Sequence, residues 1–171
     1  MYFELFSNID QVDARYQRIR AAVSEYLPSL LMALGEMSRV AVRMRIIKGV
    51  DLDEYPFKPY SENPLRVVNS PYVDGNGFYE GGYRQYKLLM KGSDRVDLNL
   101  TGEMLTAFRP EQISSDRVMV HFVSEEARQK AVENQETHGR SFVGLTDTEV
   151  IKISEYAADK LMEVAQNAWN G

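Results

Sequence analysis

The 171-residue chain contains no cysteine. Its absence excludes a disulfide framework, a thiolate nucleophile, an iron–sulfur cluster and a cysteine-ligated zinc site. A chain without cysteine fits a reducing compartment, or a particle that is assembled in one. At this length, with 44% hydrophobic residues, we expect one domain with enough apolar side chains for a real core.

Histidine is scarce, and motifs of catalysis are missing. His121 falls within an expected strand, His138 precedes a glycine in an expected turn, and the two are not at metal-ligand spacing. The sequence has no nucleophile elbow and no Walker loop. We therefore expect a protein that is not an enzyme and has no cofactor and no metal site. The alternative is a metal-dependent hydrolase that uses Asp51 and Asp53.

Long apolar runs are also missing. Residues 1–6 include an acid and no basic residue, unlike a secretory signal. The longest apolar stretch, around residues 27–34, is interrupted and too short to cross a bilayer. We expect a soluble chain without a membrane partner.

Positive charge is in deficit, and the deficit is local. The chain has 20 Lys and Arg against 25 Asp and Glu, which gives a net charge of -5. The surplus of acids lies in residues 111–171, with 6 basic and 11 acidic side chains. This balance argues against a protein whose main task is to bind nucleic acid. In the first third, Arg39, Arg43 and Arg45 are interpreted as a solvated, ion-paired face rather than as phosphate contacts.

Both ends of the chain show helical spacing. The first run predicts an amphipathic helix that ends or kinks at Pro28, followed by a second helical run from Ser29 to a stop at Gly49. Residues 146–149 form a capping box before a C-terminal helix. The apolar positions of the first and last helices are Ile9, Val12, Tyr16, Ile19, Val23, Tyr26 and Leu30, and Val150, Ile153, Ala157, Leu161, Val164 and Ala168.

Between residues 48 and 78 the periodicity disappears. The stretch is rich in proline and in aromatic residues, and it predicts a long loop that packs on something. We take its aromatic residues as candidates for a subunit or partner interface: Tyr55, Phe57, Tyr60, Tyr72 and Phe78.

Residues 79–145 predict a sheet with short helices. The spacing indicates a helix over 79–90, a strand over 96–100, a helical turn near 101–105 and a helix from 125 to about 135. Residues 108–113 and 118–123 predict a hairpin, the second strand being central, in an antiparallel sheet of at least three strands. The predicted fold is α+β: a small antiparallel sheet packed with amphipathic helices from residues 1–47 and 146–171, and a long central loop.

Four segments resemble tailed-phage virion-morphogenesis proteins when taken together. Gly49 to Ser61 is similar to a pattern G-x-D-x-x-G-x-P-F-x-P-Y-S, with Glu54 in place of the second glycine. Three further matches follow in order: Tyr83-Arg84-x-Tyr86-Lys87, then Val96-x-Leu98-x-Leu100-Thr101-Gly102-x-Met104, then His138-Gly139-Arg140-Ser141-Phe142-Val143-Gly144-Leu145. The matches span roughly residues 45 to 150.

The resemblance implies a structural role in the virion, with assembly in the host cytoplasm. Such proteins are tail-completion and neck components that form rings, here expected to be hexameric, and help to join the tail to the head. Implied partners are the connector, the tail terminator and the tail tube, with DNA passing through without specific binding. The alternatives are a tail terminator or a portal adaptor.

If the chain lines a DNA channel, we expect its acidic segment to face the lumen, where like charge keeps phosphate from binding. The alternative is a solvated helical face. The candidate channel-facing residues are Glu125, Glu126, Glu133 and Glu136.

Overall fold

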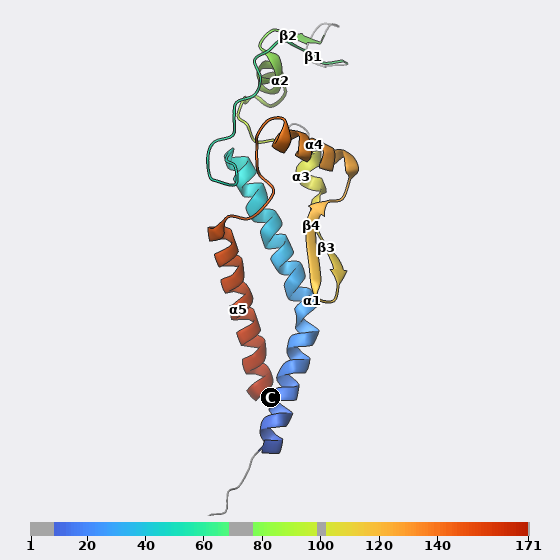
Figure 1. The fold of residues 1–171 in the computed structure, drawn as a ribbon, viewed down its shortest axis with the longest axis vertical. Helices are drawn as coiled ribbons and strands as arrows, with labels where there is room; N and C mark the ends of the chain where they lie inside the picture. Colours follow the sequence, from blue (N-terminus) through green and yellow to red (C-terminus); the bar gives the residue numbers. More distant parts are fainter. Residues whose placement is uncertain (1–8, 69–76, 99–101, 171) are drawn as a thin grey trace, which may run out of the picture. The chain divides into compact units, whose positions relative to one another are not determined.

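The computed structural model describes residues 9–68, 77–98 and 102–170. It divides into two compact units, each described by itself below. Unit 1 comprises Met1–Ser38, Pro110–Val120 and Asp147–Gly171, and unit 2 comprises Arg39–Arg109 and His121–Thr146. The expectation of a single domain stays a prediction. The elements are α1 (Ile9–Lys48), β1 (Leu65–Arg66), β2 (Phe78–Tyr79), α2 (Gly82–Lys91), α3 (Glu103–Ala107), β3 (Phe108–Ser114), β4 (Arg117–Phe122), α4 (Glu125–Glu136) and α5 (Asp147–Asn170) (Figure 1).

The α+β fold class is confirmed: long N-terminal and C-terminal helices pack together, and there are two small antiparallel sheets. The expected sheet of three or more strands is wrong, because β1 pairs with β2 and β3 pairs with β4 in separate two-stranded sheets. The predicted strand at 96–100 does not form over residues 96–98. Leu98 has φ 49, which is incompatible with an extended strand. Residues 99–100 lie outside the described residues.

Helix α1 continues through Pro28. The predicted end at Pro28 is therefore wrong, whereas the helical run from Ser29 to Gly49 is present as the second half of α1. Proline removes one backbone donor, but the turns on both sides keep theirs, and the Ser29 hydroxyl donates to the Tyr26 carbonyl at 2.8 Å. The predicted stop is confirmed at Gly49, whose φ of 75 favours glycine and whose N–H donates to the Ile46 carbonyl at 2.9 Å.

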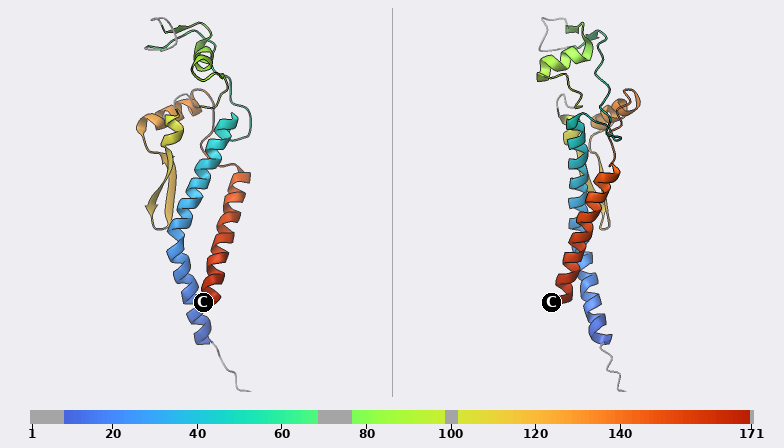
Figure 2. Two further views of the ribbon diagram at one scale, coloured as in Figure 1. Left: turned by 180° about the vertical axis from the view of Figure 1, so that it is seen from behind. Right: turned by 90° about the vertical axis from the view of Figure 1, so that its left-hand side faces the viewer.

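In unit 1, α5 runs alongside α1 (Figure 2). The Arg15 guanidinium lies 4.8 Å from the centre of the Trp169 ring, which joins the two helices near the C-terminal end of α5. The β3–β4 hairpin packs on α1 at Gly35, where a Cβ atom would come within 2.7 Å of Pro110 and 2.8 Å of Val118. The hairpin itself was predicted correctly, but β4 is half exposed and not a central strand.

In unit 2, the long loop is partly structured. Val50 and Pro56 form an isolated bridge, and β1 pairs with β2, so the segment has some secondary structure of its own. Helix α2 begins at Gly82 and not at residue 79 as predicted, since Tyr79 belongs to β2. Ser124 caps α4 by accepting a hydrogen bond from the Ala127 N–H, which agrees with the predicted helix from residue 125.

Candidate functional site

Four tyrosine rings form the centre of unit 2. Tyr60, from the loop, lies 4.9 Å from Tyr83 of α2 between ring centres, and Tyr83 lies 5.9 Å from Tyr86. Tyr79 of β2 extends the series, 5.0 Å from Tyr86. The rings meet at tilted or edge-on angles, the arrangement in which aromatic pairs attract. They join the loop, the small sheet and α2 into one body.

Two buried cations lie against the Tyr60 ring. The Lys87 ammonium is 5.3 Å from the ring centre, and the Arg140 guanidinium is 4.9 Å from it. Lys87, only 1% exposed, forms an ion pair with Asp97. Arg140, 5% exposed, donates to the carbonyls of Lys58 and Pro59 at 3.2 and 3.3 Å and to the Asn134 side chain at 3.0 Å. Both charges thus have several partners, as buried charges need.

Burial dominates the ionisation of this cluster. Burial raises the pKa of the Tyr60 phenol, with a further rise from the Asp97 charge. It raises the pKa of the Tyr83 phenol to about 12. Burial also lowers the pKa of Arg140, although a guanidinium stays charged in proteins. At neutral pH both phenols are therefore protonated, and they serve as packing and hydrogen-bonding groups rather than as bases.

A second buried arginine fixes the segment before α5. Arg45, near the end of α1, donates to the carbonyls of Phe142 at 2.8 Å and Gly144 at 2.7 Å. The Leu52 N–H donates to the Ser141 carbonyl at 2.8 Å. The interpretation of Arg45 as part of a solvated face was wrong, because it shares the buried side of the helix with Val42 and Ile46.

The cluster borders a cavity of about 700 Å³. Tyr60 and Tyr83 supply apolar wall, and the charged lining consists of Lys58, Lys130 and Arg140 against Glu133. A volume of this size is in the range of ligand pockets.

The aromatic candidates fall into two groups. Phe57 and Tyr60 are buried in unit 2, whereas Tyr55 is 70% exposed and Phe78 is 50% exposed. Tyr72 lies outside the described residues. Tyr55 and Phe78 are thus the candidates that remain accessible for an interface, while Phe57 and Tyr60 hold the loop in place.

The four acidic candidates lie on α4 and are exposed. Glu125 pairs with Arg128, and Glu126 pairs with Lys130. A hydrogen bond from each cation lowers the pKa of its glutamate partner. Glu133 lines the cavity, and Glu136 lies in the last turn. Ion pairs with basic residues of the same helix therefore neutralise part of this acidic face.

Asp51 has a local structural role. Its carboxylate accepts hydrogen bonds from the backbone N–H of Asp53 at 3.0 Å and of Tyr55 at 2.9 Å, and so it stabilises the turn. Within residues 9–68, 77–98 and 102–170, no group of three or more side chains is placed to hold a metal ion.

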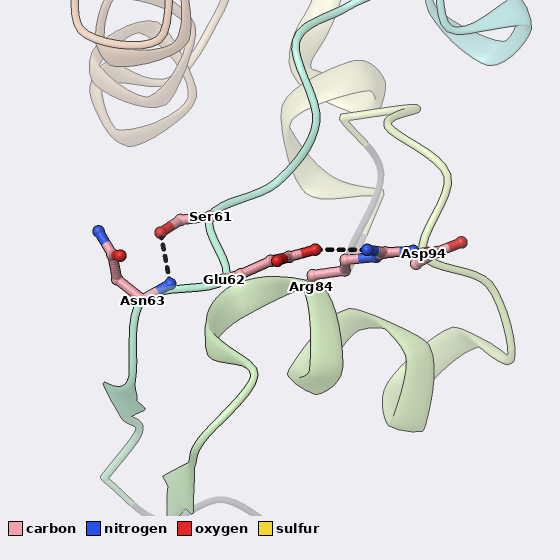
Figure 3. A network of polar contacts seen from close by, with 5 residues as sticks. All are labelled: Ser61, Glu62, Asn63, Arg84 and Asp94. Atoms are coloured by element: carbon pink, nitrogen blue, oxygen red, sulfur yellow. Dashed lines mark hydrogen bonds and ion pairs between the residues drawn. The ribbon is translucent and has the colours of Figure 1, made fainter.

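An exposed ion-pair network is centred on Arg84 of α2. Arg84 bonds to Glu62 of the loop and, at 2.7 Å, to Asp94 beyond the helix, while Ser61 accepts from the Asn63 N–H at 3.1 Å (Figure 3). Since the partners are solvated, this network orients the loop more than it stabilises the unit.

Sequence reasoning missed the cationic centre of the site. In the predicted helix over 79–90, the helical period places Lys87 on one face with Tyr83 and Tyr86, and this face is the buried one. The available signal was the charge itself, since a lysine on an apolar face needs a partner. Arg140 was present in a motif, but nothing in the sequence indicates that it bonds to residues 58 and 59.

Comparisons with protein-family models, with curated proteins and with solved structures found no match for this chain. Among the helices of the described ranges, none combines the length and the apolar character needed to cross a membrane.

Proposed function

We propose that the chain is a structural protein of a tailed-phage virion, a tail-completion component that forms a ring, expected to be a hexamer, and helps to join the tail to the head. The proposal comes from the four-segment resemblance. One structural observation supports it most: residues of all four segments meet in the core of unit 2.

Residues of different segments contact one another directly. Arg140, from the last segment, bonds to the carbonyls of residues 58 and 59 in the first. Tyr60 packs on Tyr83 from the second. Eight residues of the four segments are buried: Phe57, Tyr60, Tyr86, Lys87, Val96, Met104, Arg140 and Phe142. Others are exposed, among them Pro56, Arg84 and His138.

Backbone conformation gives a second line of support. Glu54, where the pattern has glycine, has φ 65, and Gly102 of the third segment has φ 83. Both values lie in the left-handed region, which favours glycine. At these two positions the pattern has glycine where this chain turns left-handed, whereas at Leu98, which has φ 49, it does not.

The test is to locate the chain in particles. We expect several copies per purified virion by quantitative mass spectrometry, and cryo-electron microscopy should place them as a ring at the head–tail junction. Removing the gene should leave heads and tails unjoined, and the wild-type gene should restore joining. Density at the end of the tail tube or directly beneath the portal would instead favour a tail terminator or a portal adaptor. Virions that assemble normally and lack the chain would overturn the proposal.

A further inference from the structure

Helix α1 carries an apolar repeat that extends beyond the part of the helix that α5 can cover. The spacing alternates strictly between three and four residues, the signature of a coiled-coil seam rather than of an ordinary amphipathic helix. Pro28 lies on the opposite side of the helix from this seam. The sequence positions are Tyr2, Leu5, Ile9, Val12, Tyr16, Ile19, Val23, Tyr26, Leu30, Ala33, Met37, Val40, Met44 and Ile47, of which the first two lie outside the described residues.

The start of the seam lacks cover within unit 1. Helix α5 has 24 residues against 40 in α1, and Trp169, near its end, already lies against Arg15. Helix α1 extends beyond this point (Figure 1). Ile9 is 68% exposed and Tyr16 is 61% exposed. An apolar stripe that continues past the helix it packs on within the chain indicates a contact with a second protein surface.

Helix α5 has two apolar faces, roughly 100° apart around a helix of 3.6 residues per turn. One is half-buried, and it contains Ile153, Ala157, Leu161, Val164 and Ala168. The other is an outer face, which contains Ile151, Ala158, Met162 and Ala165. Trp169 continues this face, but it already contacts Arg15 of α1 in the same chain. On the outer face Ile151 is 57% exposed and Met162 is 58% exposed. Two apolar faces on one helix indicate two neighbours, of which the described chain supplies one.

Unit 1 has little core of its own. No residue of α5 is buried. Among the buried apolar side chains of the described residues, Leu30 belongs to unit 1 and the others belong to unit 2. The start of the seam and the outer face of α5 each expose large apolar side chains, as the apolar part of an interface between subunits does before assembly.

The charges beside the two faces are complementary. The uncovered start of α1 carries Arg15, Arg18 and Arg20 against Asp10 and Asp13. Helix α5 carries five acidic and two basic side chains, with Glu155 on its outer face and Asp159 beside it. A contact between α1 of one copy and α5 of another therefore brings opposite net charges together. Contacts between two copies of α5 would not.

We propose that the start of the α1 seam, Ile9 to Ile19, packs on the outer face of α5 in a second copy of this chain. The contact is heterologous, because the two copies use different surfaces, and its repetition forms a ring when the rotation between copies closes. It deepens the proposed function, since it names the surfaces that would join the ring subunits, but it is derived from the two helix faces alone.

The absence of cysteine makes a direct test possible. Tyr16→Cys and Met162→Cys are prepared as separate full-length proteins, mixed, and treated with a short bis-maleimide. We expect cross-links between the two different variants and few between identical ones. Gln17→Cys and Asn167→Cys, both exposed and off the two faces, are the matched controls and should give at least tenfold less product. In a separate sedimentation experiment, Met162→Asp should raise the dissociation constant at least tenfold, whereas Asn167→Asp should not change it.

The outcomes separate this contact from the function it would serve. Oligomers that form with cross-links between identical variants, or that tolerate Met162→Asp, would overturn the contact and leave the virion role standing. A chain that stays monomeric at high concentration and is absent from virions would overturn both.

Discussion

Arg140 connects three segments of unit 2 through hydrogen bonds. It joins the segment before α5 to the loop after α1 through the carbonyls of Lys58 and Pro59, and it joins both to α4 through Asn134. Arg140→Met keeps the aliphatic stem but leaves these partly buried oxygens without their donor. Since a hydrogen bond to a charged group contributes about 1.5–3 kcal/mol, we expect the free energy of unfolding to fall by about 2–4 kcal/mol. Urea denaturation followed by tyrosine fluorescence measures it.

Arg128→Met on α4 is the matched control for Arg140→Met. Arg128 is exposed, and its ion pair with Glu125 is within one helix. Such a pair contributes roughly 0–1 kcal/mol, so we expect little change. Equal losses in the two variants would show that the buried hydrogen bonds of Arg140 are not what holds the segment.

Within α1, Pro28 is unfavourable for the helix, because proline has no backbone N–H to donate. Pro28→Ala restores an N–H that can bond to the Ser24 carbonyl one turn earlier. A proline inside a helix costs about 3 kcal/mol relative to alanine, and loss of the half-buried ring offsets part of the gain. We expect the free energy of unfolding to rise by about 1–2 kcal/mol, measured by thermal and urea denaturation followed by circular dichroism. Gln17→Ala, an exposed site in the same helix, should change it by less than about 0.5 kcal/mol. A destabilised Pro28→Ala would mean that ring contacts outweigh the missing hydrogen bond.

The elements that the sequence predicts well are those whose signals are local. The caps at Gly49 and Ser124, the turn into α3 and the β3–β4 hairpin depend on neighbouring residues, and all are present. Pro28 misled because proline preference is also local, while the continuity of α1 depends on turns on either side and on packing. The prediction of a third strand was wrong because strand pairing depends on a distant partner segment. The alternation around Val96 gives no information on that partner.

For the candidate site, composition identified the right segment but not the roles of its residues. Aromatic content marked the loop, yet whether a ring faces the core or solvent depends on its partners. Tyr60 is buried because Lys87 and Arg140, from segments far along the chain, lie against it. Tyr55, five residues earlier, meets neither and stays exposed. Single-sequence periodicity carries no information on such pairs.

Across the whole molecule, the two units differ in how much they bury, and this predicts how their backbones exchange hydrogen. Helices α3 and α4 pack together in unit 2 and contribute buried Met104, Leu105, Ala127 and Ala131. Helix α5 contributes none. Because opening free energies follow burial, we expect amides of α5 and of residues 9–22 to exchange at least tenfold faster than those of α3 and α4 in dilute solution. On concentration into the oligomer, only the first group should slow. Hydrogen exchange followed by mass spectrometry at two concentrations measures both. Slow exchange in α5 at every concentration would mean that unit 1 is stable without a second copy, whereas slowing confined to α3 and α4 would place the contact in unit 2.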